Sequence, residues 1–299
     1  MNFRHLRIFL TVCEVGNMTR AAKELYMAQP SVSQAIAELE KYYDVRLFER
    51  LNHRLYLTAA GERLQSYARH ILDLSEQARK ELSGLSQGGS VRIGASLTVG
   101  AYLLPDLVAA FQRQSPAVEV FTLVDNTTVI EQKILEDQLD LGIVEGPVTS
   151  PHIVEEMYGD DRLVFIASPR HPLASQESIP VEALANQPFI VREAGSGTQT
   201  IFEHAMQASE IPWKVAGIYN NNEAIKQAVI ANLGLAVVSR ITITGEIGQG
   251  KLVTLPVQEI SLKRKFNLIY HQQKFFTKAM QSFWDSCLEV LKSRPEAVG

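Results

Sequence analysis

Two short helices joined by a tight turn, within residues 18–50, constrain this chain more than any other part of it. Thr19 is a suitable N-cap for a first helix that we expect to end near Leu25. Pro30 fits the first turn of a second helix that we expect to reach Tyr43, because the first turn does not need the amide that proline lacks. The stretch therefore predicts a compact helix-turn-helix.

The second helix has one apolar and one polar face. Its apolar side chains recur at helical spacing and are expected to be buried: Val32, Ile36, Leu39 and Tyr43. The opposite face carries Gln29, Ser31, Ser33, Gln34 and Lys41. Such short hydrogen-bonding groups suit base edges and phosphates in a DNA major groove. The pattern alone leaves open an ordinary amphipathic surface helix.

The same stretch resembles the N-terminal winged helix-turn-helix of LysR-type transcriptional regulators. That family's signature has a double Ala, then Q-P-S/A-V-S, L-E and L-F-x-R. The matching residues here are Ala21, Ala22, Gln29, Pro30, Ser31, Val32, Ser33, Leu39, Glu40, Leu47, Phe48 and Arg50. The resemblance covers the whole chain and is strongest in residues 1–60. It implies DNA contacts from Thr19, Arg20, Gln29, Pro30, Ser31, Ser33, Gln34, Arg50 and Arg54.

Two further elements complete the predicted head. A preceding helix over residues 2–16 ends at Gly16 and turns one apolar face inward, with Leu6, Phe9, Leu10 and Cys13. Residues 45–58 predict two short strands around Asn52 and His53, which form the wing. Arg50 and Arg54 flank its tip, where they either contact phosphate or the minor groove or stay solvated.

Residues 59–87 predict one long helix with a heptad stripe. The stripe runs through Gly61, Leu64, Ala68, Ile71, Ser75, Ala78, Leu82 and Leu85. At about 1.5 Å per residue the helix is roughly 40 Å long, too long for a small head to cover. We therefore expect dimerisation with a second copy through Leu64, Ala68, Ile71, Ala78, Leu82 and Leu85.

The charge of the chain is weak for a nucleic-acid partner. Residues 1–88 carry 12 Lys and Arg against 10 Asp and Glu, a net +2, and the remainder carries 17 against 23, a net −6. DNA binding must then depend on a few placed groups and on dimerisation. We expect Cys13 and Cys287, at opposite ends of the chain, to be buried small hydrophobes. The first residues lack the apolar core of a signal peptide, and no run of about 18 apolar residues follows, which predicts a soluble, cytoplasmic protein.

A Gly/Ser hinge at residues 86–90 precedes a change to alternating strands and helices. We expect strands at 91–95, 118–124, 139–144, 162–167, 188–192, 214–219, 235–239 and 263–270. We expect helices at 102–114, 128–136, 198–209, 222–232 and 274–291. The alternation predicts a parallel sheet with covered faces.

The predicted fold has three parts. A mainly α winged helix-turn-helix at 1–58 is followed by a dimerising linker helix and hinge at 59–89. A two-lobed α/β effector-binding domain, periplasmic-binding-protein-like by resemblance, occupies 90–299. The resemblance assigns 91–161 and 267–299 to lobe I and 162–266 to lobe II.

Three strand-to-helix turns are candidates for a ligand site, because ligands of open α/β sheets bind at the carboxyl ends of strands. They are Gly94–Gly100, Glu193–Gln199 and Asn220–Glu223. Their hydroxyl and amide side chains are also expected to cap helices. By resemblance, a small effector binds between the lobes to Ser96, Leu97, Thr98, Glu145, Gly146, Gly195, Ser196, Gly197, Thr198 and Asn222.

Glu145 argues against a multiply charged effector. A carboxylate there repels an anion unless it is protonated, paired with Arg192 or hydrogen-bonded to the ligand's own proton. The segments I-V-E-G-P and R-E-A-G-S-G-T resemble the family's regulators of sulfur and carbon assimilation. A small, singly charged anion such as sulfite is the expected effector.

The sequence thus predicts a transcriptional regulator that binds a palindromic promoter site as a dimer or, by resemblance, a tetramer. RNA polymerase is a further expected partner, and neither cofactor nor metal is expected. The alternative is a cytoplasmic solute-binding protein without a regulatory role on DNA. An enzyme is not expected, because no nucleophile stands beside a plausible base and no phosphate-binding loop is present.

Overall fold

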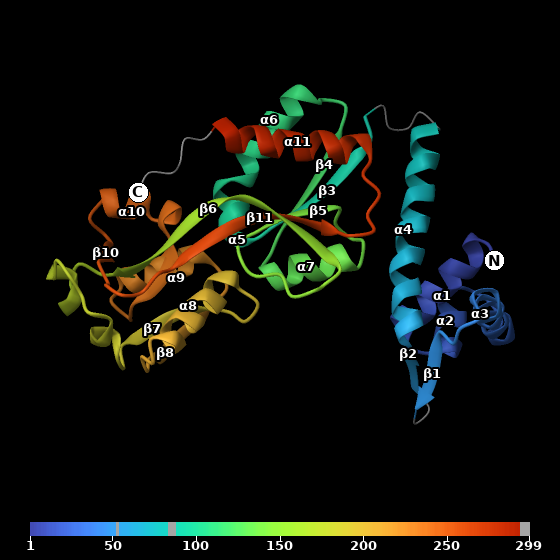
Figure 1. The fold of residues 1–299 in the computed structure, drawn as a ribbon, viewed down its shortest axis with the longest axis horizontal. Helices are drawn as coiled ribbons and strands as arrows, with labels where there is room; N and C mark the ends of the chain where they lie inside the picture. The colour runs from blue at the N-terminus through green and yellow to red at the C-terminus, as the bar shows by residue number, and fades with distance from the viewer. Residues whose placement is uncertain (52–53, 83–87, 294–299) are drawn as a thin grey trace. The chain divides into compact units, whose positions relative to one another are not determined.

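The computed structural model describes residues 1–51, 54–82 and 88–293 (Figure 1). The chain divides into two compact units. The first, here called the head unit, comprises residues 1–89 with the short stretches 135–137 and 273–275. The second, called the two-lobed unit, comprises the remaining residues.

The head unit is a three-helix core with a wing and a long helix. Its elements are α1 (Phe3–Val15), α2 (Met18–Glu24), α3 (Gln29–Tyr43), β1 (Phe48–Leu51), β2 (Arg54–Leu57) and α4 (Ala59–Leu82). The helix-turn-helix and the two wing strands are therefore confirmed. β1 and β2 pair antiparallel, from Phe48 opposite Leu57 to Leu51 opposite Arg54.

The start of α2 differs from the prediction. Asn17, not Thr19, is the N-cap: its extended backbone places Oδ1 to accept from the amides of Thr19 and Arg20, at 2.9 and 3.0 Å. Gly16 closes α1 as predicted, with φ of 65°. This left-handed conformation favours glycine and turns the chain directly into the cap of the next helix.

The packing of α3 follows its apolar spacing except at the end. Val32, Ile36 and Leu39 are buried as predicted. Tyr43 is 37% exposed, so its predicted burial is wrong. It is the last residue of α3, and Asp44, in the left-handed conformation, turns the chain away there.

The predicted stripe on α4 is divided between two environments. Leu64 and Ala68 are buried in the core of the head against α1 of the same chain, which corrects their assignment to a partner helix. Ile71 packs partly against the same core, whereas Ala78 is exposed. The side chain of Leu82 and all of Leu85 lie outside the described residues, as do residues 86–87 of the predicted hinge.

The two-lobed unit contains most of the strands. Its first half comprises β3 (Ser90–Ala95), α5 (Leu97–Tyr102), α6 (Leu104–Gln114), β4 (Glu119–Val124), α7 (Thr127–Leu135), β5 (Leu141–Val144) and β6 (Ile153–Ala167). The chain continues through short 3-10 turns at Pro172–Ser175 and Val181–Leu184 to β7 (Pro188–Arg192), α8 (Gly197–Ala208), β8 (Lys214–Tyr219), α9 (Asn222–Ile230) and β9 (Ala236–Ser239). After a 3-10 turn at Arg240–Thr242 come α10 (Thr244–Gly248), β10 (Val253–Leu255), β11 (Lys263–His271) and α11 (Lys278–Ser293).

Two long strands join the lobes. The main sheet has the order β10-β6-β11-β5-β3-β4, with β9 also on β6, and β6 and β11 run antiparallel from one lobe to the other (Figure 1). One core lies among β3, β5, α6 and α11, which we call lobe I. Two further cores lie among β7, α8, α9, β9 and β10, which we call lobe II.

Three predictions for this unit need correction. The sheet is only partly parallel: β3 pairs parallel with β4 and β5, but β11 pairs antiparallel with β5 and β6. The helix predicted at 102–114 begins two residues later, as α6, because the chain bends at Leu103 and Pro105 occupies the first turn of α6; the short helix α5 before it was not predicted. The strand predicted at 162–167 begins at Ile153, since its first half pairs with β11 along the edge of lobe I.

The cysteines behave as small buried hydrophobes. Both are free: Cys287 is fully buried and Cys13 partly so. Burial raises the pKa of each thiol to about 12. Among the described residues, no helix has the length and apolar character needed to cross a bilayer.

Candidate functional site

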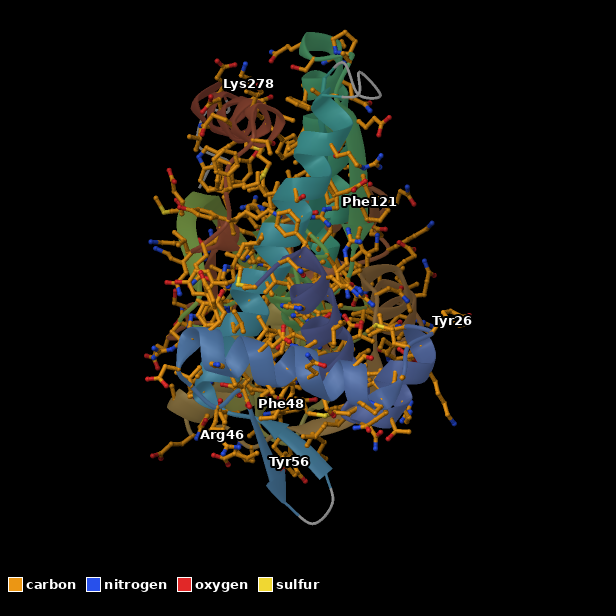
Figure 2. The ribbon with its side chains drawn as sticks, turned by 90° about the vertical axis from the view of Figure 1, so that its right-hand side faces the viewer. Tyr26, Arg46, Phe48, Tyr56, Phe121 and Lys278 are labelled. Carbon is orange, nitrogen blue, oxygen red and sulfur yellow. The ribbon has the colours of Figure 1, made fainter. Side chains whose placement is uncertain are left out.

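The outward face of α3 and the wing form a candidate nucleic-acid interface on the head unit. Gln29, Pro30, Ser31 and Gln34 are exposed on α3, and Thr19 and Arg20 are exposed on α2. Figure 2 shows Tyr26, which is 98% exposed in the turn between these helices, and Tyr56 on the wing. The backbones of Arg50 and Arg54 lie in β1 and β2, and their side chains lie outside what the structure describes.

Ser33 differs from the rest of this face. It is half-buried, its hydroxyl donates to the sulfur of Met18 at 3.2 Å, and it accepts from Nε2 of Gln29 at 2.7 Å. Ser33 therefore holds the side chain of Gln29 and joins α3 to α2. Gln29 is left with its carbonyl oxygen and one amide hydrogen for a base edge.

In the two-lobed unit, the three predicted turns meet at the hydroxyl of Thr98, and two of them hold one cation. The guanidinium of Arg264, on β11, donates to Oγ1 of Thr198 at 2.8 Å and to Oγ1 of Thr98 at 3.3 Å. Asn222, at the start of α9, donates to the same oxygen of Thr98 at 3.5 Å. Thr98 belongs to lobe I, whereas Thr198 and Asn222 belong to lobe II. The structure thus brings the three turns together across the two lobes.

Backbone contacts also close the two lobes on each other. A Cβ on Gly146 would lie only 2.5 Å from Cα of Gly197, so the two glycines allow the lobes to meet backbone to backbone. The amide of Thr128 in α7 donates to the carbonyl oxygen of Gly195, at 3.4 Å. Gly195 adopts φ of +87°, which an L side chain rarely adopts.

Arg264 lies between two buried carboxylates. Asp161 on β6 forms a direct ion pair with its Nε and also accepts from the hydroxyl of Ser239 at 2.7 Å. Glu145 follows β5 and lies 3.6 Å from Nη1 of Arg264. All three charged groups are buried, so the cluster crosses the cleft with one positive and two negative charges.

Of the three alternatives considered for Glu145, pairing with Arg192 does not occur in the structure. Arg192 pairs instead with the adjacent Glu193 through two hydrogen bonds of 2.8 Å. Burial alone would raise the pKa of Glu193, but the hydrogen bonds and charge of Arg192 outweigh it and hold that pKa below its ordinary value. Arg192 is thus neutralised locally, and Arg264 is the cation that faces Glu145.

The hydroxyls of the cleft do not serve as helix caps. Ser96 stands at the N-cap position of α5 and Ser196 at that of α8, yet neither side chain makes a capping hydrogen bond, and Asn221 rather than Asn222 caps α9. The first turn is also shorter than predicted, because α5 already begins at half-buried Leu97. Within the described ranges, the buried hydroxyls of Ser96 and Thr127 have no hydrogen-bond partner.

Arg264 and Asp161 are the principal residues that the sequence prediction missed. Leu262, just before β11, and Phe266 and Leu268 within it are buried at alternate positions, and Arg264 occupies an inward position of the same series. Alternate side chains of a strand point to the same face, so an apolar residue is expected at position 264. A cation at such a position indicates a buried charged site.

The structure thus has a DNA-binding type of head, a helix-turn-helix with a wing, and a separate two-lobed unit with a buried polar site between its lobes. This combination defines the class of ligand-responsive DNA-binding proteins. Comparisons with known proteins agree. Residues 3–62 match the family described as bacterial regulatory helix-turn-helix protein, lysR family, and residues 85–292 match the LysR substrate binding domain. The chain belongs to the LysR family of transcriptional regulators, and it is a regulator rather than an enzyme.

Relatives are similar over almost their whole length. The chain is 32% identical over 294 residues to the transcriptional activator CmpR of Synechocystis, covering 97% of this chain and 95% of that protein. It is 31% identical over 295 residues to the transcriptional regulator CysL of Bacillus subtilis, covering 98% and 97%. The solved regulatory domain of Synechocystis CcmR in complex with 2-PG is 31% identical, covers 69% of this chain and 99% of that one, and superposes with a TM-score of 0.65.

Proposed function

We propose that this regulator responds to a small, singly charged anion, sulfite being the first candidate, that binds between its two lobes. The observation that carries the proposal is the convergence of the three turns on Thr98, whose hydroxyl accepts from both Asn222 and buried Arg264, while Arg264 also donates to Thr198. Hydroxyls and a guanidinium are suitable donors for an oxyanion or a carboxylate. The relatives support this class, because the CcmR domain was solved with 2-PG.

The residues proposed to bind the effector are those of the sequence prediction with Arg264 added. They are Ser96, Leu97, Thr98, Glu145, Gly146, Gly195, Ser196, Gly197, Thr198, Asn222 and Arg264. The unpartnered hydroxyl of Ser96 supports its inclusion, since a buried hydroxyl gains from a hydrogen-bonding ligand. An anion that binds the closed lobes better than the open ones shifts the population toward closure, which is the basis of the regulatory switch.

For DNA, we propose contacts from Thr19, Arg20, Gln29, Pro30, Ser31, Ser33, Gln34, Arg50 and Arg54 to a palindromic promoter site. Residues 1–58 form the DNA-binding domain, 59–89 the linker and 90–299 the effector domain. The outward side of α4, which exposes Tyr67 and Leu74, supports pairing with a second copy. We further propose a tetramer, contact with RNA polymerase and a cytoplasmic location, because members of this family act on promoters.

Fluorescence anisotropy at fixed, near-physiological salt tests the DNA part. DNA from upstream of the protein's own gene is compared with shuffled DNA, and we expect at least about a hundredfold preference for the native sequence. Gln29→Ala should lose about 1–3 kcal/mol of that preference, the range for a bidentate base contact. Gln281→Ala, which removes the same group from an exposed position on α11, is the control. Equal loss in both variants, or equal binding to both DNAs, contradicts the assignment.

The effector part is tested by adding sulfite, sulfate, phosphate and acetate to the native complex. Sulfite is expected to change the affinity for DNA and to raise the thermal midpoint of the full chain. Thr198→Ala removes one donor beside Arg264 and should weaken the response. If no anion alters DNA binding or the midpoint, the anionic class of effector is refuted.

A further inference from the structure

Arg264 holds its two carboxylates very differently. Asp161 lies directly opposite Arg264 in the pairing of β6 and β11, forms a hydrogen-bonded ion pair with it and is fixed by Ser239. Glu145 lies 3.6 Å from the guanidinium, beyond hydrogen-bond distance. It also accepts from the amides of Thr98 and Val99 at 3.4 and 3.3 Å, at the long end of the hydrogen-bond range. Asp161 is therefore a firmly held partner and Glu145 a loosely held one.

The balance of charges in the cluster also indicates that Glu145 is loosely held. Arg264 is already neutralised by Asp161, so Glu145 is the surplus negative charge of the cluster. Its residue is 2% exposed and has lost most of its hydration. A buried carboxylate needs close partners to offset that loss, and the long contacts of Glu145 offset little of it.

The groups around Glu145 are those that bind anions. Nη1 of Arg264 also donates to Thr198 of the opposite lobe, so any group that replaces Glu145 there is held between the lobes. The side-chain oxygen of Thr127, which has no partner among the described residues, would lie 3.2 Å from a Cβ on Gly146, the next residue after Glu145. Donors of two kinds, a guanidinium and two amides, thus surround one loosely bound carboxylate, and an unpartnered hydroxyl lies beside the next residue of the chain.

We infer that Glu145 is an internal, exchangeable counter-ion of Arg264, and that an anionic effector binds by displacing its carboxylate from Arg264 and from the amides of Thr98 and Val99. This rests on the proposed function, because it specifies how an anion enters the same site. It makes Glu145 a specificity residue that sets a threshold against anions too weak to displace it. It also disfavours dianions more than monoanions, because the displaced carboxylate stays close by.

The test compares the full-length protein with Glu145→Gln by calorimetric titration with sulfite, sulfate and inorganic phosphate. Glutamine keeps the shape and an acceptor oxygen but removes the charge, so the variant should bind these anions at least about tenfold more tightly, with the larger gain for dianions. Glu131→Gln is the matched control. Glu131 is a buried glutamate of lobe I that accepts hydrogen bonds from Thr149 and Ser150, and its variant should bind as the native protein does.

Misfolding of Glu145→Gln would weaken anion binding, so tighter binding by this variant cannot be an effect of misfolding. Weaker or unchanged binding by Glu145→Gln overturns the inference, because Glu145 would then be an acceptor for the effector or remote from it. The thermal midpoint without anion gives a second readout. It should rise in Glu145→Gln if the charge is surplus, and a fall would overturn the inference. If no anion binds either protein while the midpoint rises, the proposed anionic effector fails and the surplus charge of Glu145 stands.

Discussion

Gly197→Ala should hold the two lobes apart without unfolding either of them. Its new Cβ would lie 2.8 Å from both the carbonyl oxygen of Glu145 and the amide nitrogen of Gly146, which are backbone atoms of the opposite lobe and cannot rotate away. Gly197 is the first residue of α8 and does not have a positive φ, so alanine adds no backbone strain there. Overpacking of this kind costs about 1–3 kcal/mol, so the open population should rise about 5- to 150-fold.

Hydrogen exchange on the full-length protein measures this opening directly. The amide of Thr128, which donates across the lobes to Gly195, should exchange faster by that factor, while amides within the lobe cores keep their native protection. Gly245→Ala is the control, because a Cβ there meets nothing within 4 Å. Unchanged exchange at Thr128 would refute the claim that the glycine contact holds the lobes together.

Two more predictions concern stability. Asn17→Ala should lower the free energy of unfolding of the head by about 1 kcal/mol in urea denaturation, whereas Thr19→Ala should leave it nearly unchanged; the reverse order would restore Thr19 as the cap. The thiol of Cys287, with its pKa raised to about 12, should resist a thiol reagent at pH 8 until the protein unfolds. The protonated thiol of Cys287 contributes fully to the stability of the folded protein below pH 9.0, the pKa of the unfolded thiol. This contribution is lost as the pH rises toward 12, because the thiol ionises first in the unfolded chain. The decline of stability with pH should therefore be smaller in Cys287→Ala.

The parts that local sequence determines were predictable. The spacing of Val32, Ile36 and Leu39, with Pro30 in the first turn, placed α3 correctly, and the pattern of residues 45–58 predicted the two wing strands, β1 and β2. These features depend on periodicity and on turn chemistry within a few residues. The cap of α2 was missed because Asn17 and Thr19 are both good capping residues and only the backbone conformation separates them.

The centre of the candidate site was harder to predict, because it depends on contacts between distant segments. Arg264 is 103 residues from Asp161 and 66 from Thr198 in the sequence, and no local pattern links them. The turns could be recognised from their Gly, Ser and Thr content, but the cation that joins two of them is the second residue of a strand, β11. Leu64 and Ala68 were misassigned for a related reason, since a heptad stripe does not reveal which of two neighbours covers it.

The position of β11 in the main sheet affects the order in which the protein folds during its synthesis. β5 and β6 leave the ribosome more than 90 residues before the strand that separates them in the finished sheet. Until residues 263–271 have emerged, both strands carry unpaired edges, and the core of lobe I lacks α11 as well. The pairing that joins the two lobes is therefore completed only late in translation, and a chain that ends before residue 263 would lack both β11 and the last helix of the lobe I core.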